Sequence, residues 1–194
     1  MQKPFLLICA LTFSLLAFGA ASTTTSSAAD ETVSASREQT TAAAHDAAIR
    51  WLGARVSAYQ RATWQWQRLM GEPLIKTPGR TLTGMTVADI RQAVRLWRDR
   101  AAAARRRAQN PPDLRAWLCV HRYEGSWSDD GAPYYGGLQM DLRFQQSYGG
   151  RLLETKGTAN HWTPLEQIWV AERARRSGRG FSPWANSARS CGLF

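Results

Sequence analysis

The chain has 194 residues and a formal net charge of +10, from 25 Lys and Arg residues against 15 Asp and Glu residues. Such a basic protein is attracted to anionic surfaces, for which a bacterial wall and nucleic acid are the two candidates. Its 3 histidines lie far apart in sequence, with no Cys or acid at metal-ligand spacing. A zinc site is therefore excluded, no glycine-rich phosphate loop is present, and we expect no cofactor.

The N-terminal residues 1–21 have the pattern of a secretory signal peptide. Lys3 precedes an apolar run from Phe5 to Phe18, and small residues follow up to Ala21. The run is too short for a transmembrane helix, which needs roughly 20 residues. We expect cleavage after Ala21, or alternatively after Ala29, and no stable membrane insertion afterwards. An uncleaved anchor is the competing interpretation.

Cleavage would also change the cysteine count. It removes Cys9 and leaves Cys119 and Cys191 in a chain bound for an oxidising compartment. A disulfide between the remaining two is the natural inference. On the chain-entropy model, closing so long a loop stabilises a fold by about 4 kcal/mol.

Two helices are predicted over residues 42–109, after a flexible linker over residues 22–41 that is mostly Ser, Thr and Ala. The first helix ends at Met70, before Gly71, and the second starts at an N-cap, Thr86, with Asp89 three residues on. We expect them to form an antiparallel hairpin, and its tryptophans to fill the core more readily than to bind sugar. The apolar positions at helical spacing are Ile49, Leu52, Val56, Tyr59, Trp66, Leu69, Val87, Ile90, Val94, Trp97 and Ala101.

Residues 110–194 form the last predicted domain. Asn110-Pro111-Pro112-Asp113 has the composition of a helix start, with a cap residue, a proline in the first turn and an acid at the third position. The helix that follows places Leu114, Trp117 and Val120 on one apolar stripe, which ends at Glu124. A loop rich in Ser, Asp and Gly comes next, and Thr163-Pro164-Leu165-Glu166 has the spacing of a capping box at a further helix start.

The chemistry-bearing segment is Tyr134-Tyr135-Gly136-Gly137-Leu138-Gln139, ten residues after Glu124. Aromatic rings stack on apolar sugar faces, paired glycines admit a polymer close to the backbone, and a Gln amide both donates and accepts hydrogen bonds. A nearby carboxylic acid can protonate a glycosidic oxygen, and burial favours the protonated form that this step needs. The pattern predicts glycan cleavage with Glu124 as general acid; a Glu paired with Arg122 or another surface Arg is the alternative.

A family resemblance makes this hypothesis more specific. From Cys119 onward the chain resembles the transglycosylase-like domain of the resuscitation-promoting factors, within the lysozyme-like superfamily. The shared features are Glu124-Gly125-Ser126-Trp127, Tyr134 to Gln139, Tyr148-Gly149-Gly150, Gln167-Ile168, Val170-Ala171-Glu172, Trp184 and Cys191-Gly192. Two features depart from the family: four residues separate Cys119 from Glu124, which are adjacent there, and Phe144-Gln145 replaces a Thr-Trp pair.

The resemblance implies an α+β fold, namely a small lysozyme-like domain, with the Cys119–Cys191 disulfide. It also implies cleavage of the bond between N-acetylmuramic acid and N-acetylglucosamine in peptidoglycan glycan strands. We expect a secreted, wall-located monomer. A non-catalytic peptidoglycan-binding module is the alternative.

Four side chains are candidates for substrate binding: Gln139, Tyr135, Trp127 and Trp184. For Gln139 and Tyr135 the alternative is a buried hairpin turn, and for the two tryptophans it is core packing.

A second carboxylate would have to come from Asp129, Asp130 or Asp141. The first two are typical turn formers, and Asp141 is placed to cap the next turn. The resemblance implies a single acid, with the substrate's own C6 hydroxyl or a water as nucleophile. We expect the C6 hydroxyl, and therefore 1,6-anhydro products.

The basic tracts Arg105-Arg106-Arg107 and 173–179 are interpreted as solvated helix faces. No aromatic stacking platform accompanies them, so we expect no nucleic-acid partner.

Overall fold

The computed structural model describes residues 26–76 and 84–194. They are mostly helical, with one small two-stranded sheet, which agrees with the α+β class. The predicted signal peptide and residues 22–25 of the predicted linker lie outside the described residues. None of the described helices combines the length and the apolar character that a membrane span requires.

Helix α1 (Ser26–Met70) begins well before the residue 42 that the sequence suggested. The chain divides after Ala44 into two units, and residues 26–44 of α1 belong to the first. This part includes most of the predicted flexible linker, yet it is helical, and its side chains are exposed from Glu31 onward. Ala, Glu and Arg are strong helix formers, and the hydroxyls of Thr40 and Thr41 donate to carbonyls one turn back.

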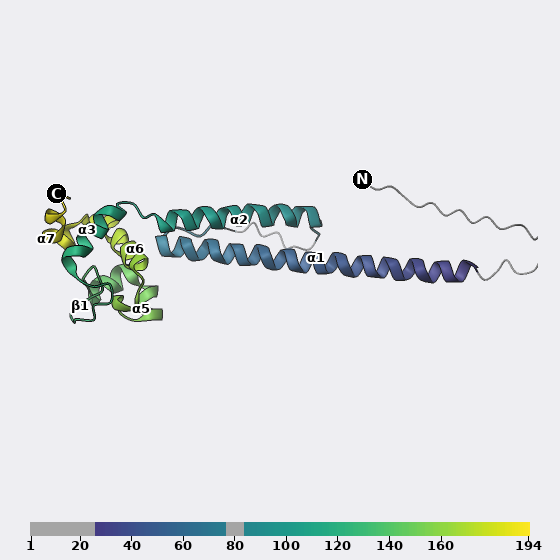
Figure 1. Cartoon of the computed structure of the whole chain (residues 1–194), viewed down its shortest axis with the longest axis horizontal. Coiled ribbons are helices and arrows are strands. Elements are labelled where there is room, and N and C mark those ends of the chain that lie inside the picture. The colour runs from purple at the N-terminus through teal and green to yellow at the C-terminus, as the bar shows by residue number, and fades with distance from the viewer. Residues whose placement is uncertain (1–25, 77–83) are drawn as a thin grey trace, which may run out of the picture. The chain divides into compact units, whose positions relative to one another are not determined.

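In the second unit, the remainder of α1 packs along α2 (Val87–Gln109), and the two helices run parallel (Figure 1). One cluster joins the middle of α1 to the first part of α2, where Leu52 packs with Ile90. The late residues meet in another, where Met70 packs with Ala104. The predicted antiparallel hairpin is therefore wrong in orientation. The core role expected for the tryptophans holds at Trp97, which is 4% exposed, but not at Trp51, which is 60% exposed.

The connection between the helices explains the parallel arrangement. After Met70 the chain turns back along α1: the Gln67 side chain bonds Pro73 O and Ile75 N, and Trp64 Nε1 donates to Ile75 O. An extended residue advances about 3.3 Å and a helical residue 1.5 Å, so about 16 connecting residues can run back along a 23-residue helix. Thr86 and Asp89 then form the predicted capping box.

Residues 110–194, predicted from the sequence as the last domain and called so below, contain most of the short elements and belong to the same unit as the helix pair. These elements are α3 (Leu114–Glu124), β1 (Tyr134–Tyr135), β2 (Met140–Asp141), α4 (Leu142–Phe144), η1 (Gln145–Gly149), α5 (Arg151–Lys156), η2 (Ala159–His161), α6 (Pro164–Ala174), η3 (Arg175–Arg179), η4 (Ser182–Trp184) and α7 (Ala185–Ser190). Strands β1 and β2 are antiparallel, with Tyr135 opposite Met140. The core is built around fully buried Trp117, Val120 and Leu138, so the apolar stripe of α3 faces inward as predicted.

The predicted helix start at Asn110 is not where α3 begins. Asn110 caps the C-terminus of α2, and α3 starts only at Leu114. A proline disfavours helical backbone in the residue before it, so Pro111 keeps Asn110 out of the helix. Asp113 has a left-handed φ of 54° and pairs with Arg175 at 3.1 Å. The capping box at Thr163 is present at the start of α6.

Helix α6 fastens the C-terminal ends of both long helices to this domain. Trp169 Nε1 donates to Ala108 O, and Arg173 Nη1 donates to Leu69 O, both at 2.7 Å. Burial, together with the nearby charge of Arg176, lowers the pKa of Arg173 to about 10.

A disulfide joins Cys119 on α3 to Cys191 after α7, the pairing that the sequence predicted. Because α3 ends at Glu124, this link holds the helix that carries the candidate acid against the C-terminal segment.

Candidate active site

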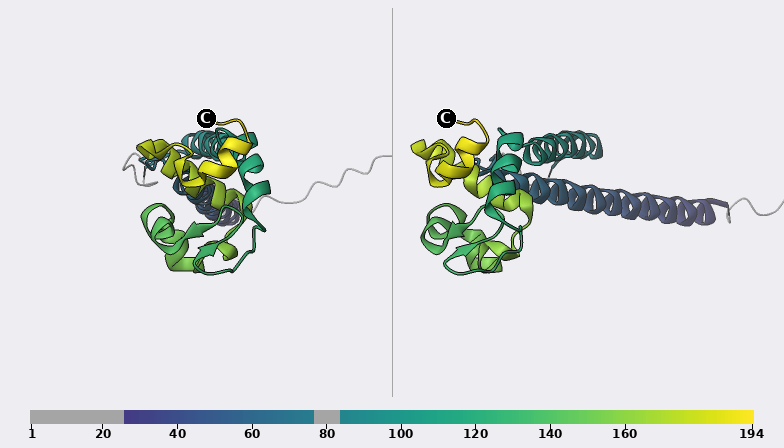
Figure 2. Two further views of the ribbon diagram at one scale, coloured as in Figure 1. Left: turned by 90° about the vertical axis from the view of Figure 1, so that its left-hand side faces the viewer. Right: turned by 60° about the vertical axis from the view of Figure 1, so that its left-hand side comes forward.

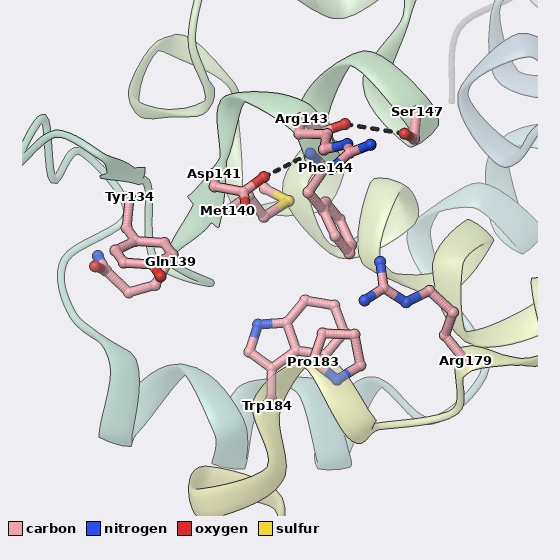
Figure 3. A pocket seen from close by; sticks show the side chains of 10 residues that line it. All are labelled: Tyr134, Gln139, Met140, Asp141, Arg143, Phe144, Ser147, Arg179, Pro183 and Trp184. Carbon is pink, nitrogen blue, oxygen red and sulfur yellow. Dashed lines mark hydrogen bonds between the residues drawn. The ribbon is translucent and has the colours of Figure 1, made fainter.

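A groove of about 450 Å³ lies between two segments of the last domain (Figure 3). One wall comes from residues 134–147, around β1, β2 and α4, and the other from residues 179–184. Figure 2 shows β1 and α5 in green on one side of the domain and α7 in yellow on the other. The lining residues are Tyr134, Gln139, Met140, Asp141, Arg143, Phe144, Ser147, Arg179, Pro183 and Trp184.

Glu124 is the last residue of α3 and is half-buried. Its Oε1 accepts a hydrogen bond from the Ser187 hydroxyl, which belongs to α7 and is 6% exposed. The next residue, Gly125, is so close to Gln139 that an added Cβ would lie 3.3 Å from the Gln139 amide nitrogen. Glu124 is not itself among the groove-lining residues, but its chain neighbour Gly125 lies against one of them, and one of its carboxylate oxygens is bonded by Ser187.

Gln139 lines the groove and is held rigidly. Its backbone has a left-handed φ of 46°, and its Nε2 donates to Asp129 Oδ2 at 2.8 Å and to Gly136 O at 3.0 Å. The amide nitrogen has two hydrogens, so both are used. Among the described residues no hydrogen bond involves Oε1, which is left to accept one from a sugar hydroxyl or an N-acetyl N–H group.

The turn between β1 and β2 is braced by Gln167, which is fully buried on α6. Its Oε1 accepts from Gly137 N at 2.8 Å, and its Nε2 lies 2.8 Å from Trp127 O and 2.9 Å from Ala159 O. One side chain of α6 therefore links the Gly-Gly turn, the loop that follows Glu124 and η2. The buried-hairpin interpretation of this segment and the binding interpretation are thus compatible.

Trp127 stacks on His121, with ring centroids 3.9 Å apart and planes 20° apart. His121 Nδ1 lies 3.0 Å from Gly137 O, and since a carbonyl only accepts, Nδ1 carries the proton. A Cβ on Gly137 would come within 2.6 Å of the His121 ring, so only glycine allows this approach. Trp127 is partly buried against the core and does not line the groove.

The tyrosine of β1 that lines the groove is Tyr134, and not Tyr135, which the sequence analysis had chosen. Tyr134 is 50% exposed and lines the groove, whereas Tyr135 is partly buried against the core. Successive side chains of a strand point to opposite faces, so only one of them can face the groove. Trp184 is 4% exposed and its Nε1 donates to Leu138 O at 2.7 Å. It is a core residue whose remaining edge forms part of the groove, so both interpretations of it apply.

The three candidate second carboxylates have local tasks. Asp141 caps α4 by accepting from Phe144 N at 2.6 Å. Asp129 accepts from Gly131 N as well as from Gln139. Asp130 is exposed in the loop between them. The first two act as the turn and cap residues that the sequence predicted.

The groove also contains two cations that the sequence analysis did not single out. Arg143 and Arg179 line it, and the Arg179 guanidinium lies 5.8 Å from the centre of the Phe144 ring (Figure 3). Neither is within 4.0 Å of a carboxylate in the described part of the chain. Both are available to an anionic group of a ligand.

Below the groove, a buried carboxylate supports the helices. Glu172 is fully buried and accepts hydrogen bonds from Trp117, Arg175 and Arg176. Burial by itself raises the pKa of this carboxyl, but the three donors and the Arg175 charge outweigh it, so the pKa lies below its usual value.

No group of three or more His, Cys, Asp or Glu side chains is placed to hold a metal ion among the described residues. Comparison with protein-family models, curated proteins and solved structures found no match to this chain.

Proposed function

We propose that residues 110–194 form a small lysozyme-like domain that cleaves peptidoglycan glycan strands outside the cell, with Glu124 as general acid. The observation that carries this proposal is the end of α3, where a half-buried carboxyl bonded by Ser187 directly precedes Gly125, the residue that lies against Gln139 of the groove wall. The groove supplies what a glycan needs: an exposed aromatic at Tyr134, a rigid amide at Gln139 and unpaired cations.

The reaction starts with proton transfer from Glu124 to the oxygen that joins N-acetylmuramic acid to N-acetylglucosamine. Ser187 holds Oε1, so in this proposal the proton is carried by Oε2. The side-chain Oε1 of Gln139 accepts a hydrogen bond from the sugar and so fixes the position of the sugar. Asp129 and Asp141 are already bonded within their turns, so we assign the attack to the substrate's own C6 hydroxyl in place of an enzyme-activated water. Its oxygen bonds to the anomeric carbon of N-acetylmuramic acid as the glycosidic bond breaks, the N-acetylglucosamine part leaves as the protonated alcohol, and the C6 hydroxyl proton passes to the Glu124 carboxylate.

One observation favours a second candidate, a wall-binding module without turnover. Glu124 is not among the groove-lining residues, and one of its oxygens is already bonded. A groove that only binds would need Tyr134, Gln139 and the cations, but no free carboxyl.

Release of soluble fragments from purified walls tests the two candidates. Glu124→Gln keeps the shape but removes the transferable proton, and we expect at least about a hundredfold loss of rate. Glu154→Gln, an exposed change on α5, is the matched control and should retain full activity. A wild-type protein that binds walls without cleaving them would favour the binding module. Normal activity of Glu124→Gln would exclude Glu124 as the acid.

A further inference from the structure

The positive charge of the protein is concentrated away from the groove. Residues 45–109, which include the helix pair, contain 13 basic and 4 acidic residues, whereas residues 110–194 contain 10 and 8. Residues 45–109 therefore contribute +9 to the total net charge of +10, residues 110–194 contribute +2, and residues 1–44 contribute −1. This asymmetry requires an explanation beyond solubility.

The charge is arranged in a line on α2. Arg91, Arg95, Arg98 and Arg105 follow one another at steps of four, three and seven residues, so they lie on one face of the helix. All four are exposed, and we call them the arginine stripe. The stripe is about 21 Å long at 1.5 Å per helical residue.

Carboxylates of the described residues neutralise little of the positive charge of the stripe. Of its members only Arg98 lies within 4.0 Å of a carboxylate in the part of the chain that the structure describes, that of Asp99. Like charges three or four residues apart destabilise a helix, so Arg91, Arg95 and Arg98 act against the folding of α2. A bound polyanion would remove that repulsion.

The side chains around the stripe indicate which class of anionic partner fits it: nucleic acid, a lipid surface or a phosphate polymer. Trp97 is the sole aromatic residue of α2 and is 4% exposed, so the stripe has no ring on which bases could stack. The apolar face of α2 packs on α1 through Ile90 and Trp97, so it cannot enter a lipid surface as a membrane-binding amphipathic helix does. Leu96 is the one large apolar side chain that α2 exposes, at 48%. A row of cations with so little exposed apolar surface fits a linear chain of phosphates.

We propose that the arginine stripe binds a linear phosphate polymer of the bacterial wall and so retains the enzyme on its substrate. The biological setting rests on the proposed wall-cleaving function, whereas the binding chemistry does not. The stripe lies on a different element from the groove, so polymer binding and glycan cleavage are separate activities of one chain.

The test measures binding of the purified protein to long-chain inorganic polyphosphate over a range of salt concentrations. Each neutralised phosphate contributes roughly 0.7 to 0.9 to the slope of log affinity against log salt. Replacing Arg91, Arg95 and Arg105 by Gln should therefore lower the slope by about 2 to 3. Replacing Arg115, Arg122 and Arg189, which are exposed in the last domain, removes the same charge and should leave the slope unchanged.

Three results would overturn the proposal: equal losses in both triple variants, tighter binding to single- or double-stranded DNA, or tighter binding to phosphatidylglycerol vesicles than to polyphosphate. Glu124→Gln should bind polyphosphate like the wild type. If the protein binds polyphosphate but cleaves no walls, the proposed enzymatic function is refuted and the proposed role of the stripe stands. If it cleaves walls but does not bind polyphosphate, the role of the stripe is refuted and the enzymatic function stands.

Discussion

Gln167 offers the sharpest test of how the groove is built. Gln167→Met keeps the length of the side chain but removes its amide, which is fully buried. The change leaves Gly137 N without its acceptor and takes donors from the carbonyls of Trp127, Ala159 and Trp162.

The magnitude follows from counting these bonds. The amide nitrogen has two hydrogens, so it can satisfy two of the three carbonyls well at one time, and Oε1 adds a third bond. At about 1 kcal/mol for each bond, the free energy of unfolding should fall by about 3 kcal/mol, or more because buried groups are left unpaired. For a unit of this size that lowers Tm by about 6 to 12 °C.

Urea and thermal unfolding, followed by tryptophan fluorescence, measure this loss. Gln146→Met changes an exposed Gln of η1 and should stay within about 0.5 kcal/mol of the wild type. If Gln167→Met were equally stable, the bracing role assigned to Gln167 would be incorrect. Below its Tm the variant should also clear walls more slowly, because Gly137 lies in the turn between Tyr134 and Gln139, which line the groove.

Three further predictions concern the supports of the domain. Replacing Cys119 and Cys191 by Ser should cost about 4 kcal/mol, since the disulfide closes a loop with a separation of 72 residues, and the secreted protein should gain two hydrogens in mass only after reduction. The pKa of Glu172 is lowered in the folded protein, so the stability that this carboxylate contributes is complete above about pH 4.3 and is lost as the pH falls through the lower folded value. Acid should therefore destabilise the wild type more than it destabilises Glu172→Gln. At neutral pH, Glu172→Gln should lower the free energy of unfolding by about 3 to 5 kcal/mol. Arg173→Met should cost about 2 kcal/mol in thermal unfolding, through its lost bond to Leu69 O, and Arg173→Lys should not restore it.

Local rules predicted the local structure well. The capping boxes at Thr86 and Thr163 lie where the sequence indicated, because each needs only residues three apart. The end of the first helix at Met70 also follows from adjacent residues. Asn110 shows the limit of such rules: the same Asn-Pro signal can end one helix as well as start the next, and here it ends α2.

Orientation and side-chain partners could not be predicted in this way. The helix pair runs parallel, and the segment after Met70 turns back along α1, held there by Gln67 and Trp64, whose contacts no periodicity reveals. Which of Tyr134 and Tyr135 faces the groove depends on the register of a two-residue strand.

Two further residues show the same limit at the site. The partner of Glu124 is Ser187, 63 residues away, for which the sequence analysis found no signal. Gln167 is one of the residues on which the family resemblance rests, but its bracing role could be recognised only from the contacts in the folded structure.

Mass spectrometry of the fragments released from purified walls tests the central claim most directly. The wild type should release muropeptides one water lighter than hydrolytic products, because the C6 hydroxyl closes a 1,6-anhydro ring after Glu124 protonates the bridging oxygen. Glu124→Gln should release almost none, while Glu154→Gln should match the wild type. Fragments with only free reducing ends would show that water is the nucleophile, and unchanged release by Glu124→Gln would contradict the assignment of the acid.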